Sequence, residues 1–277
     1  MQLTVLADNN TFISRYFLAE PALSLFIQVQ GRTILLDCGF SDVFLRNAGT
    51  AGLDLLQLDT IAFSHGHLDH TWGMTELVRM YARAALEGRP HKRPQVLAHP
   101  RTFESVMDER GVDQGSMLSK DKVEQHFPLK LSTTPVYITP GLVWLGEIPR
   151  ITFFESRKAL GWKTDDFRPD YVPDDTALAY ISPEGLVIVT GCSHSGICNI
   201  VHHARQVTGE DRVVDIIGGL HLQSPDEEQL TGTIDFLKTL NLTDLHACHC
   251  TDFYSRTAMA ADLPLRATGC GMQLNYP

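Results

Sequence analysis

Short apolar segments separated by polar turns dominate the first third of the chain. In residues 23–29, Leu25, Ile27 and Val29 alternate with polar or opposite-facing positions, a spacing that predicts a half-buried strand. Residues 74–86 instead have the apolar spacing of a helix, which Gly88 and Pro90 would end. Further strands are expected at 3–6, 33–36, 60–63 and 95–98.

The last third alternates between the two patterns. Strands are expected at 141–145, 177–181, 185–190, 213–217 and 244–248, and helices at 199–207 and 225–240. Ser224 and Glu227 have the spacing of a capping box, and Pro225 suits a first helical position. Leu230, Ile234 and Leu237 would give this helix a buried stripe. Strands mixed with helices at both ends indicate an α/β (α+β) protein with helices covering sheets.

Two segments are less regular. Residues 101–140 hold scattered glycines, prolines and charges, and are expected to form an insertion or cap within one domain spanning 1–277. Residues 157–175 are rich in Asp, Lys, Pro and aromatic residues, which predicts a long surface loop. Long loops in compact domains are often functional.

Composition narrows the class of ligand. Of the 277 residues, 43% are hydrophobic and 20% are charged, which are ordinary globular values. The formal net charge is −10, with no basic block, and this argues against nucleic acid as a partner. A small molecule, including a phosphorylated one, remains compatible because bound cations reverse the local field of an acidic protein.

The chain is expected to be cytoplasmic and to have no membrane partner. It begins without a charged leader and a long apolar stretch, and its apolar runs are too short to span a bilayer. In such a chain the six cysteines are expected to be reduced thiols rather than disulfides. The sequence leaves the oligomeric state open.

The residues with most chemical meaning follow the apolar segment 60–63. His65, His67, Asp69 and His70 offer four metal ligands within six residues. Imidazole and carboxylate are ligands for zinc, manganese or iron, and one ion would not need all four groups so closely spaced. The spacing therefore predicts a centre that binds two metal ions.

Other candidate ligands also follow apolar strands. They are Asp37, His99, His194, His221 and His249. Strand ends gathered along one sheet edge can converge on a single cleft held by rigid elements. By contrast, a metal shared by the two thiols of Cys248 and Cys250 is not expected.

The motifs at 64–70 (SHGHLDH), 35–39 (LLDCG) and 189–194 (VTGCSH) resemble the metallo-beta-lactamase superfamily of metallohydrolases. The segments 146–150, 191–197, 218–222 and 248–250 look like a narrower branch related to dihydropterin-aminobenzene ribofuranosyl phosphate synthases. The resemblance covers nearly all of the chain. It implies a four-layer αββα sandwich of two mixed sheets covered by helices.

The resemblance also implies a ligand set. His65 and His67 would bind one metal, and Asp69 and His70 the other, with Asp69 a second candidate as catalytic proton acceptor. His99 occupies the place of the next histidine.

Two positions leave alternatives open. Cys192 stands where the superfamily has a bridging aspartate, and His194 is favoured over it as a ligand. His249 matches the closing histidine, while His221 competes for that place or orients substrate as a catalytic residue.

Three further residues are expected around the ligands. Asp37 would brace the metal-binding loop by hydrogen bonds. Glu147 and Arg150 belong to the narrower branch and would either bind substrate or pin a turn.

We therefore expect a metal-dependent hydrolase that activates water on two divalent ions, with zinc favoured over manganese or iron. A small phosphate ester, a phosphodiester or a lactone would suit such a centre. Positive charge for a phosphate could come from Arg157, Lys158, Lys163 or Arg168, although these could equally form a solvated loop face.

Two alternatives remain. The narrower resemblance suggests a transferase joining a dihydropterin to an aminobenzene ribofuranosyl phosphate. The aromatic residues available for its pocket are Trp72, Phe154, Trp162, Phe167 and Tyr171. The cysteine at the bridging position is also compatible with a non-catalytic metal-containing sensor or binding module.

Overall fold

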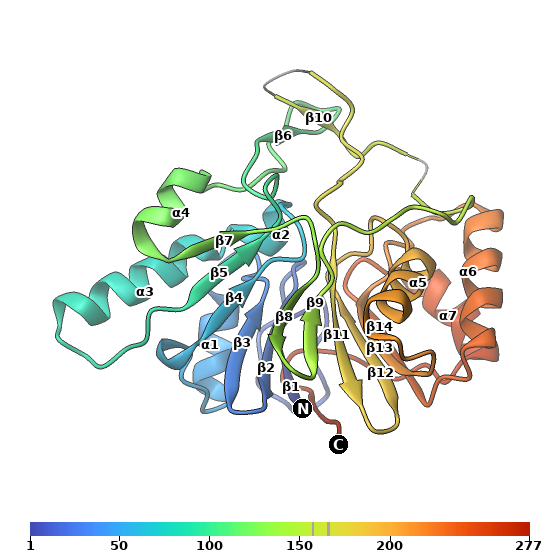
Figure 1. Cartoon of the computed structure of the whole chain (residues 1–277), viewed down its shortest axis with the longest axis horizontal. Helices are drawn as coiled ribbons and strands as arrows, with labels where there is room; N and C mark the ends of the chain where they lie inside the picture. Colours follow the sequence, from blue (N-terminus) through green and yellow to red (C-terminus); the bar gives the residue numbers. More distant parts are fainter. Residues whose placement is uncertain (157, 165–166) are drawn as a thin grey trace.

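Two large β-sheets stacked face to face, each covered by helices on its outer side, make up the protein (Figure 1). The computed structural model describes residues 1–156, 158–164 and 167–277, and within these the sheets have seven and six strands. This arrangement confirms the predicted αββα sandwich.

The first sheet comes mainly from the first half of the chain. Its order is β15-β1-β2-β3-β4-β5-β7, and β3, β4, β5 and β7 run parallel. In chain order the strands are β1 (Gln2–Ala7), β2 (Ser24–Val29), β3 (Arg32–Leu36), β4 (Thr60–Ala62), β5 (Gln95–Ala98), β7 (Leu129–Leu131) and β15 (Gln273–Asn275).

The second sheet has the order β14-β13-β12-β11-β9-β8, and β12, β13 and β14 run parallel. Its strands are β8 (Val136–Thr139), β9 (Leu142–Trp144), β11 (Ala177–Ser182), β12 (Gly185–Thr190), β13 (Val213–Gly219) and β14 (Asp244–Cys248). Each sheet thus has a parallel half.

Three apolar layers hold the sandwich together. Between the sheets, Val187 and Val189 of β12 pack with residues of the first sheet, while Leu186 and Ile188 face the helices outside. Because β12 is buried on both faces, its sequence is continuously apolar.

Helices cover both outer faces. The first sheet is covered by α1 (Val43–Thr50), a 3-10 turn (Leu55–Gln57), α3 (Met74–Leu86) and α4 (Lys120–His126). The second is covered by α5 (Ile197–Thr208), α6 (Glu227–Thr239) and α7 (Phe253–Asp262). The short α2 (Leu68–Thr71) directly follows the histidine-rich turn.

The capping prediction for α6 was wrong. The side chain of Asp226, not Ser224, accepts a hydrogen bond from the first turn, at the backbone N–H of Gln229 (2.9 Å). The backbone N–H of Ser224 instead donates to Asp252 (2.7 Å), which holds Ser224 outside the helix. The predicted stripe is present, since Leu230 and Leu237 are buried and Ile234 packs against them.

The segment 101–140 divides into two parts. Its first part includes β6 (Val106–Met107), which pairs with β10 (Trp162–Lys163) above the sandwich (Figure 1). Its second part enters the large sheets, because β7 and β8 are edge strands of them. In the described part of the chain, no helix has the length and apolarity to cross a membrane.

Candidate metal centre

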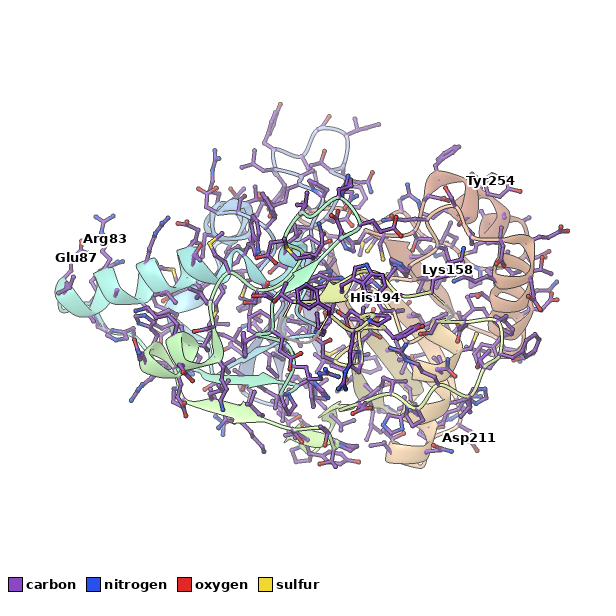
Figure 2. The ribbon with its side chains drawn as sticks, turned by 90° about the horizontal axis from the view of Figure 1, so that it is seen from above. Arg83, Glu87, Lys158, His194, Asp211 and Tyr254 are labelled. Atoms are coloured by element: carbon purple, nitrogen blue, oxygen red, sulfur yellow. The ribbon has the colours of Figure 1, made fainter. Side chains whose placement is uncertain are left out.

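The candidate ligands converge where the parallel strands of both sheets end. Asp37 follows β3, His65 follows β4, Cys192 follows β12, His221 follows β13 and His249 follows β14. Seen from above, His194 lies in the middle of the molecule, between the two helix-covered halves (Figure 2). The fold therefore brings residues from sequence positions 37 to 249 to one edge.

Three histidines form the first ligand group, which we call the imidazole set: His65, His67 and His194. The Nε2 atom of His65 lies 3.1 Å from Nδ1 of His67 and 3.1 Å from Nε2 of His194. Ligand nitrogens at 2.0–2.1 Å from a tetrahedral zinc are about 3.3 Å apart, so this spacing suits a shared cation.

The second group, which we call the mixed set, contains Asp69, His70, Cys192 and His249, whose ligand atoms lie within 4.8 Å of one another. His70 Nε2 lies 3.2 Å from Cys192 Sγ. His249 Nε2 lies 3.2 Å from Asp69 Oδ2 but is not aligned with it as a hydrogen-bond donor. Such a buried, unpartnered nitrogen beside a carboxylate suits a cation between them. The residues present thus fit two ions.

Cys192 stands between the two sets. Its Sγ also lies within 4.8 Å of the ligand nitrogens of His65 and His194. The choice between Cys192 and His194 is therefore not exclusive, because the structure brings both to the centre.

Burial controls the protonation of the imidazole set. Burial first, and the neighbouring histidines second, hold the pKa values of His65 and His194 well below the usual value. The neutral imidazole that this favours is the form that binds metal.

In the mixed set, neighbouring charges determine the protonation states of His70 and Asp69. Burial lowers the pKa of His70, but the charges of Asp69 and Asp37 outweigh it and raise that pKa to about 9. Burial disfavours the charged form of Asp69, yet His70 and His249 overcome this and hold the pKa of Asp69 below its usual value. Asp69 is therefore an anion beside a protonated His70 when no cation is present.

Asp37 braces the ligands from beneath, as the sequence suggests. Its Oδ2 atom accepts from the Ser64 hydroxyl (2.6 Å) and from His70 Nδ1 (2.7 Å), and its Oδ1 atom accepts from the backbone N–H of Ser64 (2.8 Å). Because that hydroxyl donates to Asp37, it accepts from His65 Nδ1 (3.0 Å). Both histidines are thereby held with Nε2 free to bind a cation.

Sequence reasoning missed two adjacent aspartates, Asp174 and Asp175. Asp174 Oδ2 accepts from the backbone N–H of Gly66 (2.7 Å), between His65 and His67. Asp175 Oδ2 accepts from the backbone N–H and hydroxyl of Ser195 (2.9 and 2.5 Å), next to His194. Burial raises the pKa of Asp175 to about 6. Their only sequence signal was a paired carboxylate just before a strand, inside the predicted loop.

Several residues with a strained backbone conformation also lie at this edge. Asp37, Ser193, His221 and His249 all have positive φ angles, between 47° and 59°. Non-glycine residues seldom adopt this left-handed conformation, and it clusters at functional sites, where surrounding contacts maintain it.

His99 is not brought into either set. It follows β5, which lies one strand beyond β4 in the first sheet. Its Nδ1 accepts from the backbone N–H of Arg101 (3.2 Å), and its Nε2 lies 3.5 Å from Glu147.

Glu147 and Arg150, which were assigned to the narrower branch, lie at the margin of the metal site. Glu147 is exposed on 54% of its side chain and contacts His99. Arg150 donates to the backbone carbonyl groups of Tyr171 and Val172, the latter at 2.8 Å. Arg150 therefore fastens the segment that leads into Asp174.

His249 and His221 occupy different places. His249 lies in the mixed set, with its Nδ1 on the Asn9 side chain (3.2 Å). His221 lies beside Cys192 and Cys250. All six cysteines belong to the described residues, and none of them forms a disulfide.

Two adjoining cavities give access to these residues. One, of about 290 Å³, is lined by His67, Asp69, Cys192, His194, His221 and Cys250 among others. The other, of about 190 Å³, includes Phe154, Lys158, His194 and His221. Lys158 and His194 thus line the same cavity next to the metal sets. Both residues are labelled in Figure 2, where they lie near one another.

The other predicted cations and aromatic residues have different places. Lys163 is buried between Glu104 (3.3 Å) and Asp170 (3.5 Å), so it is not available to a phosphate. Trp72 stacks on Phe40, and Trp162, Phe167 and Tyr171 are exposed. Arg157 lies outside the described residues.

The fold and these ligand sets define a class of protein. The chain belongs to the metallo-beta-lactamase superfamily, whose family model matches residues 19–206. Members of this superfamily are typically enzymes that depend on divalent metals.

Individual relatives cover almost the whole chain. A 7,8-dihydropterin-6-methyl-4-(beta-D-ribofuranosyl)-aminobenzene-5'-phosphate synthase of Methanocaldococcus jannaschii is 30% identical in an alignment 269 positions long that covers 91% of this chain and 88% of the relative. The crystal structure of Tm1679, described as a metal-dependent hydrolase of the beta-lactamase superfamily, superposes with a TM-score of 0.83 at 23% identity, covering 99% and 98% of the two chains. Zn(2+)-bound PqqB of Methylobacterium extorquens superposes with a TM-score of 0.57 at 12% identity, covering 99% and 100%. The two structures support the fold.

Proposed function

We propose that this protein is a metal-dependent hydrolase of small molecules, with one divalent ion in the imidazole set and a second in the mixed set. The observation that carries the proposal is the convergence of two ligand sets beside an open cavity, with Cys192 of the mixed set also lying next to the imidazole set. Zinc is the favoured ion, because imidazole, carboxylate and thiolate together form its usual ligand set. Such a pair of ions supplies Lewis acidity, which activates water and polarises a substrate oxygen.

The chain's own residues position the reactants. Asp69 and His221 both line the cavity of about 290 Å³, where Asp69 can accept a proton and His221 can orient substrate. Lys158 in the adjoining cavity can attract a negative group. A small phosphate ester, a phosphodiester or a lactone suits this arrangement, and the net charge of −10 disfavours a nucleic acid.

The test combines metal analysis with a hydrolase screen. Purified protein is expected to contain transition metal and to hydrolyse at least one phosphomonoester, phosphodiester or lactone substrate. His67→Ala is expected to lower the metal content and abolish hydrolysis, because it removes a ligand of the imidazole set. His126→Ala, an exposed position on α4, is the matched control and should change neither. Unchanged metal content in His67→Ala would refute the assignment.

A second candidate is the transferase reaction, favoured by the 30% identity to the M. jannaschii synthase across 91% of the chain. Phe154 lines the second cavity, where its ring could stack on a flat heterocycle, and Lys158 could hold a phosphate. Incubation with a dihydropterin that carries a phosphate or diphosphate ester as leaving group and with an aminobenzene ribofuranosyl phosphate, followed by mass spectrometry, tests this reaction. A joined product with release of the phosphate or diphosphate supports the transferase, and hydrolysis of that ester without a joined product supports the hydrolase.

A further inference from the structure

A third group of metal-binding side chains lies beside the imidazole and mixed sets. The thiols of Cys192 and Cys250 and the ring of His221 offer ligand atoms that all lie within 4.8 Å of one another. We call these three residues the sulfur set. Of these three residues only Cys192 belongs to another set, the mixed set, and neither Cys250 nor His221 is needed to hold the two ions proposed above.

The fold places the sulfur of Cys250 firmly. Its Sγ atom accepts from the backbone N–H of His221 (3.2 Å) and lies 3.5 Å from the carbonyl oxygen of Cys192. Gly219 lies against it, and a side chain at that position would overlap the sulfur. The absence of a side chain at Gly219 thus lets β13 and the turn after β14 approach closely enough to bring Cys250 to His221.

A second, independent observation indicates that His221 is a metal ligand. Its Nδ1 atom is buried and has no hydrogen-bond partner among the described residues. The residue is also held at a φ of 47°, and it lines both cavities next to the site. A buried nitrogen without a partner is costly, and a cation would satisfy it.

We propose that Cys192, His221 and Cys250 bind a thiophilic divalent cation, such as Cd²⁺ or Zn²⁺, in a position distinct from the two ions of the hydrolase centre. Two thiolates and one imidazole select soft or borderline ions over magnesium and calcium. Three protein ligands leave a fourth position open, and the cavity lined by all three residues provides it. On binding, each thiol releases its proton to solvent and the two sulfurs coordinate the ion, so one cation replaces two protons.

The shared thiol couples this position to its neighbours. Cys192 belongs to the mixed set, lies beside the imidazole set and also belongs to the sulfur set. A thiophilic ion that holds Cys192 in the sulfur set therefore competes with the mixed set for the same sulfur. Cadmium in excess is expected to weaken the ion bound by Asp69, His70 and His249.

Cadmium binding tests the proposal in the full-length protein. One equivalent of Cd²⁺ is added to metal-free protein, and the ultraviolet charge-transfer band between sulfur and cadmium is recorded. The wild-type chain should show the band of two thiolates, and Cys250→Ser should show about half of its intensity, because one of the two sulfurs is removed. Cys198→Ser, a buried cysteine on α5 outside the set, is the matched control and should keep the full band.

Two further measurements keep the test decisive. X-ray absorption at the cadmium edge counts sulfur neighbours in the wild-type chain without any substitution, and two sulfurs are expected. One sulfur or none, or an undiminished band in Cys250→Ser, would overturn the proposal. His67→Ala should retain the band even where hydrolysis is lost, so failure of the sulfur set and failure of the hydrolase proposal give different results.

Discussion

Asp37 decides which nitrogen of His70 is available to a metal, and Asp37→Asn should change that choice. In the wild-type chain the carboxylate accepts from His70 Nδ1 and the Ser64 hydroxyl through one oxygen, and from the Ser64 backbone through the other. An asparagine that keeps the backbone hydrogen bond must turn its NH₂ group towards His70. The Nδ1 atom must then accept, the proton moves to Nε2, and Nε2 can no longer bind a cation.

The expected magnitude follows from the role of such partners. Loss of a hydrogen bond that orients a metal ligand typically lowers metal affinity about 10- to 100-fold, which corresponds to about 1.4–2.8 kcal/mol. Asp37 also orients His65 through Ser64, so the upper part of that range is expected. The fold should persist, because the substitution leaves the volume of the side chain almost unchanged.

The assay is competition for Zn²⁺ with a chromophoric chelator, accompanied by thermal unfolding of each protein. Asp215→Asn is the matched control, because Asp215 is also a buried aspartate that binds a histidine, His246 (3.0 Å), and the Tyr276 hydroxyl (2.7 Å). It lies four residues before the end of β13, about 13 Å along the strand from the site. Equal zinc affinity in Asp37→Asn and wild type, or an equal loss in both variants, would refute the reasoning.

Three other predictions concern the same loops. Gly66→Ala should abolish metal binding or unfold the site, because the new methyl group would overlap the carbonyl oxygen of Thr102. Circular dichroism and metal analysis check this, and a normal metal content would contradict it. Asp174→Ala should lower metal affinity about 10-fold, and Asp174→Asn should restore most of it, because an amide oxygen can still accept from Gly66; equal affinity of the two variants would argue against this contact. The affinity for the ion in the mixed set should rise with pH up to about 9, because that ion must displace the proton on His70, whereas the metal-free protein loses the stability of the protonated pair as pH rises towards about 9. Chelator competition and thermal unfolding across that range would show both trends, and flat profiles would exclude them.

Local patterns predicted many of the strands and helices and the candidate ligands at strand ends, whereas the αββα sandwich was implied by the resemblance of the motifs to a known superfamily. The apolar composition of runs such as β12 and β13 indicates that these strands are buried. A histidine that directly follows such a run lies at the end of a strand, whatever the position of that strand in the sheet. The helices α1 and α7 were missed. Their apolar stripes are short, because the buried apolar residues are only Phe44 and Ala48 in α1 and Met259 in α7.

The remaining parts of the site depend on tertiary distances that no local pattern encodes. His99 has the same local setting as His65, but its strand lies one position further out in the sheet. Asp174 and Asp175 are identical in type and adjacent, yet they brace loops that come from different sheets. Cys250 lies beside Cys192 and His221 because β13 pairs with β14, which no local pattern in the sequence encodes.

The most direct test of the central claim is a crystal structure of zinc-loaded protein with anomalous diffraction measured at the zinc edge. Apart from any ion held by the sulfur set, two peaks should be found, one within coordination distance of His65, His67 and His194 and one within coordination distance of Asp69, His70 and His249. A zinc-loaded crystal with no peak at either set, or with a peak only at residues outside both, would contradict the two-ion centre.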